Sequence, residues 1–213
     1  MDRDAESVWR LLEDGNEVPV VTLDDFFVLA AEGGRPQGAF WFSPRMGDGI
    51  DFEFYRRVLM GQAPADTIVE HTVQTGRRIS DIMGTSLVTA TVVTKRVVLL
   101  LQERELTGWR PYRTRLFDKK GQALEGEFFS LGVIGRAGPP DMARIVKEWD
   151  VKADGTKVPK RFGGGLFFHL ERWDGSDFSL IDESKATVVT QRVLAALEEA
   201  GVGNWTARRV TKE

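Results

Sequence analysis

The sequence predicts an α+β fold, a single domain with a duplicated helix-plus-strand unit on a mainly antiparallel sheet. The segment Ser80–Trp109 aligns without gaps with Ser176–Trp205, 96 positions further on, and 12 of the 30 pairs are identical. Average residue usage would give roughly two identities by chance. This period is far longer than that of solenoid repeats. The identical pairs include Asp81/Asp177, Thr94/Thr190, Arg96/Arg192 and Trp109/Trp205.

Four elements are expected before the first copy. Ala5–Asp14 carries apolar residues at helical spacing, whereas Leu23–Ala31 is consistent with a short helix or a strand. Gly38–Phe42 is typical of a buried strand that follows a Gly- and Pro-containing break. Phe52–Met60 is ambiguous between helix and strand.

Each copy contains a predicted helix. Thr94 is expected to be the first N-cap, with its side-chain oxygen accepting an N–H of the first turn. Val97, Leu100 and Leu101 then share one helix face. Thr190 is the corresponding cap in the second copy.

A strand is expected after each helix. Trp109 and Trp205 are interpreted as core anchors because tryptophan is highly buried on average. In the first copy, the turn at 118–121 and the strand at 127–134 complete a hairpin. The second copy ends soon after Trp205 and lacks this returning strand, but a strand is predicted before it at 163–170.

These elements suggest a simple organisation. We expect one domain over residues 1–213, with an acidic N-terminal region (1–75), a first repeat unit (80–136) and a second repeat unit (163–210). The stretches 138–140 and 153–160 are expected to be loops.

Composition excludes several classes of site. The 213 residues contain no cysteine, which excludes disulfides, thiolate metal sites and cysteine nucleophiles. No apolar run approaches the ~20 residues of a membrane span. The acidic first residues lack the basic start and apolar stretch of a signal peptide. We therefore expect a cytoplasmic protein without a cofactor.

Charge is distributed unevenly along the chain. Residues 1–54 hold 12 acidic and 4 basic residues, whereas the rest hold 20 acidic and 25 basic ones. An acidic segment can steer a basic partner or imitate nucleic acid. The alternative is a solvated face or a segment packed on the basic remainder.

Catalytic motifs are weak. His71 and His169 lie far apart and in no ligand-like spacing, and His169 is expected to be a partly buried residue of an apolar strand. Arg161–Gly165 is glycine-rich but lacks the Lys and Ser/Thr of a phosphate-binding loop. We expect no enzymatic activity and no metal.

A turn with an aromatic residue and carboxylates is the best candidate for binding. Trp173, Asp174 and Asp177 lie on this turn, where they either contact a partner or cap local backbone. The full candidate interface with a partner adds the acidic residues of the N-terminal region: Asp2, Asp4, Asp24, Asp25, Asp48 and Asp51.

Several segments carry a family resemblance: Gly165–Phe168, Trp173–Phe178, Val188–Val193, Ala196–Glu198 and Asn204–Trp205, with Val93–Val97 and Leu106–Tyr112 in the first copy. Over residues 80–137 and 163–210 the chain resembles the immunity protein 11 family of bacterial polymorphic toxin systems. The family tends to have a glutamate where Lys95 and Gln191 stand. The resemblance implies a protein that neutralises a toxin encoded nearby, with a nuclease as one candidate, and has no catalytic residues.

The leading hypothesis is therefore an immunity protein that forms a stoichiometric complex with a toxin or effector. An adaptor or chaperone that holds a secreted effector is the alternative, and an enzyme of unknown chemistry ranks third. A pI near 5.6 argues against a nucleic-acid partner, and no membrane association is expected. The sequence does not indicate an oligomeric state.

Overall fold

The computed structural model describes residues 9–11, 17–19, 21–32, 38–45, 51–87, 91–144, 149–152, 155–159, 165–182 and 186–211. Their main features are a closed six-stranded barrel, in the order β4-β5-β8-β9-β7-β6, and a five-stranded sheet, in the order β10-β13-β14-β3-β15. Most neighbouring strands are antiparallel. The predicted α+β class and mainly antiparallel pairing are confirmed.

The barrel strands are β4 (Trp41–Pro44), β5 (Ile68–Thr75), β6 (Ile82–Thr85), β7 (Thr91–Thr94), β8 (Trp109–Phe117) and β9 (Phe128–Val133). The five-stranded sheet contains β3 (Phe26–Ala31), β10 (Gly135–Gly138), β13 (Phe178–Ile181), β14 (Ala186–Thr190) and β15 (Trp205–Arg209). Two separate pairs are β1 (Trp9–Leu11) with β2 (Glu17–Pro19), and β11 (Trp149–Val151) with β12 (Lys157–Pro159). The helices are α1 (Phe52–Leu59), α2 (Lys95–Glu103) and α3 (Gln191–Glu199), with 3-10 turns η1 (Leu23–Asp25) and η2 (Leu170–Arg172).

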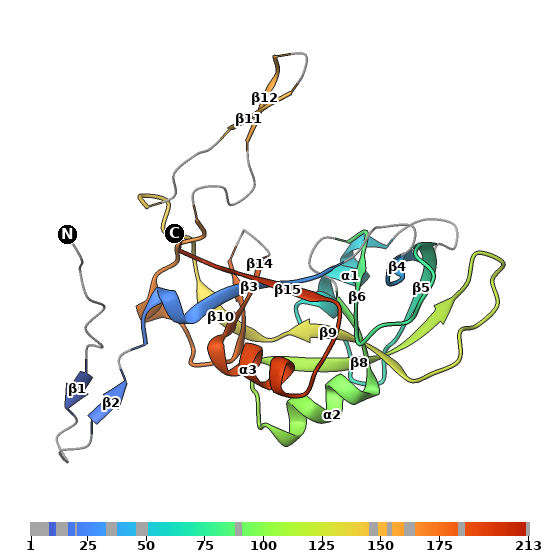
Figure 1. Ribbon diagram of the computed structural model, residues 1–213, viewed down its shortest axis with the longest axis horizontal. Coiled ribbons are helices and arrows are strands. Elements are labelled where there is room, and N and C mark those ends of the chain that lie inside the picture. Colours follow the sequence, from blue (N-terminus) through green and yellow to red (C-terminus); the bar gives the residue numbers. More distant parts are fainter. Residues whose placement is uncertain are drawn as a thin grey trace.

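Helices α2 and α3 lie side by side on one side of the strands (Figure 1). Their predicted apolar faces are buried: Val97 and Leu101 of α2 share one core cluster with Val193 and Leu197 of α3. Burial of apolar side chains stabilises the fold by about 1.5–3 kcal/mol for each large one. This cluster therefore joins the barrel to the five-stranded sheet.

The helix starts differ from the prediction in one respect. Thr94 and Thr190 are the N-cap residues, as expected, but neither side chain accepts an N–H from its helix. Instead the Thr94 hydroxyl donates to Asp81 and the Thr190 hydroxyl donates to Asp177, over 3.2 and 2.8 Å. A carboxylate is a stronger acceptor because the hydrogen bond is charge-assisted.

Strand β3, from the N-terminal region, has a place in the five-stranded sheet like that of β9 in the barrel. Strand β9 lies between β7 and β8, and β3 lies between β14 and β15. Val92 of β7 pairs with Ser130 of β9, and Val188, 96 positions after Val92, pairs with Val28 of β3. Because β4 and β5 also belong to the barrel, the acidic region is not a separate layer.

Other N-terminal expectations are resolved in the structure. The helix predicted over 5–14 is wrong at Trp9–Leu11, which form β1, and the rest of that segment lies outside the described residues. The ambiguous segment 23–31 is η1 followed by β3, and 52–60 is almost entirely α1. A short apolar run alone does not distinguish helix from strand.

Two connections differ from the prediction. The strand expected at 163–170 is wrong over the described residues 165–170: among them only Phe168 forms a β-bridge, to Pro140, and the chain then enters η2. Gly165 adopts a positive φ of 93°, which turns the chain before Leu166. Part of the loop expected at 153–160 is strand β12. The hairpin of β8 and β9 is confirmed, and both Trp109 and Trp205 pack against the core.

Candidate protein-binding surface

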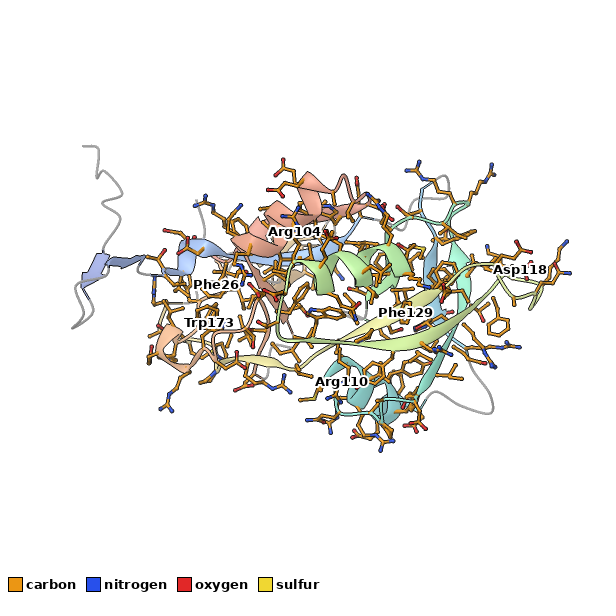
Figure 2. All side chains as sticks on the ribbon, turned by 90° about the horizontal axis from the view of Figure 1, so that it is seen from below. Phe26, Arg104, Arg110, Asp118, Phe129 and Trp173 are labelled. Atoms are coloured by element: carbon orange, nitrogen blue, oxygen red, sulfur yellow. The ribbon has the colours of Figure 1, made fainter. Side chains whose placement is uncertain are left out.

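Trp173 is held in place by Phe26. Their ring centroids are 4.9 Å apart and the rings meet edge to face, at one end of the molecule (Figure 2). The indole Nε1–H donates to the Ser176 carbonyl (2.9 Å) and to the Ser179 hydroxyl (3.2 Å). Phe26 directly follows Asp25 in the chain. The structure thus brings the Trp173 turn and the Asp24–Asp25 segment together.

Asp24 and Asp25 lie in η1 and are exposed. Asp25 Oδ2 accepts the Thr22 N–H at 2.7 Å and the Thr22 hydroxyl at 3.1 Å, so it caps the backbone at the start of this turn. Asp24 accepts the Thr211 hydroxyl near the end of the chain. Both carboxylates therefore have local partners while they still face solvent.

The carboxylates of the Trp173 turn have different environments. Asp174 is exposed and accepts the N–H groups of Arg136 (2.8 Å) and Ser176 (3.0 Å), so it also caps local backbone. Asp177 is only 3% exposed. Its carboxylate accepts from Thr107, Thr190 and Arg192. Asp177 is a structural residue, and nothing in its geometry leaves it available to a partner.

Of the remaining candidates, the structure describes only Asp51. Asp51 is the N-cap of α1, with Oδ1 accepting the Phe54 N–H at 2.8 Å, and α1 packs on the barrel strand β9. Asp2, Asp4 and Asp48 lie outside the described residues.

Neighbouring exposed residues were missed by sequence reasoning. Met142 is 64% exposed and lies two residues after Pro140, which bridges to Phe168. The Phe168 ring is 5.1 Å from that of Phe26. No local sequence pattern indicates where Met142 lies, because the long-range bridge between Pro140 and Phe168 determines its position. We call the following set the Trp173 surface: Asp24, Asp25, Met142, Glu171, Trp173 and Asp174.

The two histidines lie in different environments, and the placement predicted for His169 is wrong. His169 lies outside any strand and is exposed, with Nδ1 3.3 Å from Glu171 Oε1. His71 is buried inside the barrel. Within the described ranges, no group of three or more histidine or acidic side chains is arranged to hold a metal ion. Most of the glycine-rich segment 161–165 lies outside those ranges.

Known proteins provide no identification. No family model matches the chain, and no curated protein matches it. Among the helices described, none is long and apolar enough to cross a membrane. The family resemblance therefore rests on the residue motifs alone.

Proposed function

We propose that this protein is a cytoplasmic immunity protein that binds and neutralises a cognate bacterial toxin through the Trp173 surface. The supporting observation is the convergence of Trp173, Met142 and exposed carboxylates from three separate chain segments. Aromatic residues and methionine are enriched in protein interfaces. The motifs shared with the immunity protein 11 family point in the same direction.

The chemistry of this surface suits a basic partner. Asp24, Glu171 and Asp174 are exposed carboxylates that lie close in the chain to Phe26 and Trp173, whose rings are in contact. Exposed carboxylates accelerate association with a positively charged protein, whereas buried apolar contacts slow dissociation. A basic substrate cleft, such as that of a nuclease, is the proposed target, and the complex blocks the toxin by occlusion.

The proposed scaffold is a duplicated unit. In its support, β13, β14 and α3 start near the positions 96 residues after β6, β7 and α2. The indole N–H groups of Trp109 and Trp205 donate to the carbonyls of Leu106 and Val202, which also differ by 96 positions. Strand β3 then completes the second unit from the other end of the chain.

Co-expression with the toxin domain encoded nearby tests the proposal. Cells should survive only when the protein is present, and the purified pair should form a complex in which the toxin is inactive. A complex with a fully active toxin would instead favour the adaptor or chaperone. Survival without any complex would point to an enzyme that acts on the toxin or its product.

Two charge reversals locate the interface. Glu171→Lys changes an exposed carboxylate of the Trp173 surface, and Glu198→Lys makes the same change on α3. We expect Glu171→Lys to lower the association rate about 3- to 10-fold at low salt, and Glu198→Lys to have little effect. Equal effects would place the interface elsewhere.

A further inference from the structure

The barrel encloses an ionisable side chain. His71, on β5, is 1% exposed. Its ring centroid lies 5.7 Å from that of Tyr55 on α1 and 6.5 Å from that of Phe42 on β4. Strand β8 pairs alongside, with Leu116 opposite His71. An imidazole in such surroundings is stable only in its neutral form, because a buried charge needs close polar partners.

The polar contacts of His71 are few. Its Nε2 is 3.4 Å from the Ser130 hydroxyl, which in turn is 2.9 Å from the Thr114 hydroxyl. Thr114 donates to the Tyr112 carbonyl. Nδ1 of His71 has no hydrogen-bond partner. An imidazolium would carry two donors here, and of the two nitrogens only Nε2 has a hydrogen-bond partner.

The five-stranded sheet has no such polar cluster at the positions that correspond to Ser130 and Thr114. The corresponding positions around the five-stranded sheet are apolar. Val28 pairs with Val188 as Ser130 pairs with Val92, and Val210 lies 96 positions after Thr114. Phe168 forms a β-bridge with Pro140, and in the barrel His71 is the register partner of Pro44, 96 positions before Pro140. At these positions the five-stranded sheet therefore carries apolar side chains where the barrel carries the histidine and two hydroxyls.

Helix α1 lies over this histidine. The Tyr55 hydroxyl donates to the Glu70 carbonyl (2.9 Å), and the Tyr112 hydroxyl donates to the Ala63 carbonyl (3.0 Å) just after the helix. Arg110 donates to the Gly61 carbonyl (3.1 Å). The apolar cluster of Val58 with Val69 and Tyr112 also holds α1. An eight-residue helix has little stability of its own, so α1 depends on these contacts.

No charge near His71 favours its protonated form. Tyr55 is neutral at ordinary pH, since burial raises the pKa of its phenol to about 12. Glu70 pairs with Arg45 and Arg115. Strands β8 and β9 present the hydroxyls described above, and β4 presents the Phe42 ring.

Burial determines the protonation of this imidazole. It lowers the pKa of His71 to about 4, partly opposed by the backbone of Ser43. The Ser43 backbone nevertheless makes no hydrogen bond to Nδ1. His71 is therefore neutral near pH 7 and becomes protonated only under acid conditions.

We propose that His71 is an acid-sensitive lock, and that its protonation releases helix α1 from the end of the barrel. Release lets water reach the imidazolium through the space that Tyr55 covers. The lock is separate from the Trp173 surface and does not depend on the proposed function.

Hydrogen exchange and imidazole NMR test the lock. The chain has two histidines, so His169→Phe leaves His71 as the sole imidazole signal. After correction for intrinsic exchange, the open population of α1 should rise about 30-fold from pH 7.5 to pH 5, given an ordinary pKa of 6.5 in the open state. The pH range in which the open population of α1 rises should match the pH range in which the imidazole NMR signal shows protonation of His71.

Matched variants complete the test. His71→Phe copies the side chain at position 168 and should abolish the pH response of α1, whereas His169→Phe should retain it. The proposal is overturned if α1 exchange does not change with pH in the His169→Phe protein. It is equally overturned if the opening free energy of α1 equals that of α3 at each pH, since α1 would then open only by global unfolding. The measurement on His169→Phe does not depend on whether His71→Phe folds.

Discussion

Asp81 and Asp177 each accept a backbone N–H from the connection that follows the other copy's helix. Asp81 Oδ2 accepts the Gly203 N–H at 3.2 Å, and Asp177 Oδ2 accepts the Thr107 N–H at 3.0 Å. Gly203 and Thr107 differ by the same 96 positions as the two aspartates. Each half of the molecule therefore supplies an acceptor that the other half needs.

Arginines extend this reciprocal arrangement. Arg96 pairs with Asp81 (2.7 Å) and also donates to the Ala200 carbonyl at the end of α3. Arg192 pairs with Asp177 (3.1 Å), and its guanidinium approaches the Arg104 carbonyl at the end of α2 (3.5 Å). Cations are favoured near helix C-termini. Each of the helices α2 and α3 thus supplies an arginine that approaches the C-terminal end of the other helix.

Removal of these carboxylates should have unequal effects on stability. Asp177→Ala removes a carboxylate that is only 3% exposed and that accepts from Thr107, Thr190 and Arg192, so we expect a loss of about 3 kcal/mol of unfolding free energy. The Asp81 side chain is 21% exposed, and water can replace part of its contacts. Asp81→Ala should cost about 1–2 kcal/mol in urea unfolding. Equal costs would contradict the role assigned to burial.

Gly132 should be essential for seating α1. A Cβ at this position would lie 2.4 Å from the Val58 carbonyl oxygen and 2.9 Å from the Gly61 Cα. Gly132→Ala should therefore cost about 1–3 kcal/mol and raise hydrogen exchange in α1. Ala30, at the corresponding register position on β3, is exposed. Ala30→Val serves as the control and should change the unfolding free energy by less than about 0.5 kcal/mol.

The sequence predicted the local features and missed the long-range ones. The spacing of Val97, Leu100 and Leu101 was sufficient to predict α2, because helical periodicity is a local signal. The pairing of β3 with β14 and β15 joins residues more than 150 positions apart, and no local pattern encodes it.

The aspartate network had a sequence signal that the prediction did not use. The repeated residues Asp81, Thr94 and Arg96 recur as Asp177, Thr190 and Arg192, and together they form the network. Identity across the copies thus marked structural residues, which is why the interface role predicted for Asp177 lacked support. Trp173 has no tryptophan counterpart in the first copy and remains the candidate for binding.

Trp173 should contribute to both stability and binding. Trp173→Phe keeps a ring against Phe26 but removes the N–H donated to Ser176, which should cost about 1 kcal/mol. Trp173→Ala also removes the ring contact and should cost about 2–3 kcal/mol, less than for a fully buried tryptophan. In the proposed toxin complex, Trp173→Ala should raise the dissociation rate with a nearly unchanged association rate. Surface plasmon resonance on the folded fraction measures both rates. An unchanged dissociation rate would remove Trp173 from the interface.

Acid should lower global stability through His71. Its folded pKa of about 4 is below the ordinary value of 6.5, so the unfolded state binds more protons between these limits. The stabilising contribution is complete above pH 6.5, and it is lost as the pH falls toward 4. The loss amounts to about 3 kcal/mol at 1.36 kcal/mol for each pH unit. Urea unfolding from pH 7.5 to 4 should show this loss in His169→Phe, and a much smaller one in His71→Phe.

Alkali should act in the opposite direction through Tyr55. Burial, followed by the negative charge of Glu70, raises the pKa of Tyr55 from its usual 10 to about 12. The unfolded state therefore releases its phenol proton first, and the stability present below pH 10 is lost as the pH rises through 12. The chain has only two tyrosines. The difference between the ultraviolet titrations of the parent protein and Tyr55→Phe therefore gives the signal of Tyr55. A difference spectrum with a midpoint near pH 10 would show that α1 leaves Tyr55 in water, and that it does not cover His71.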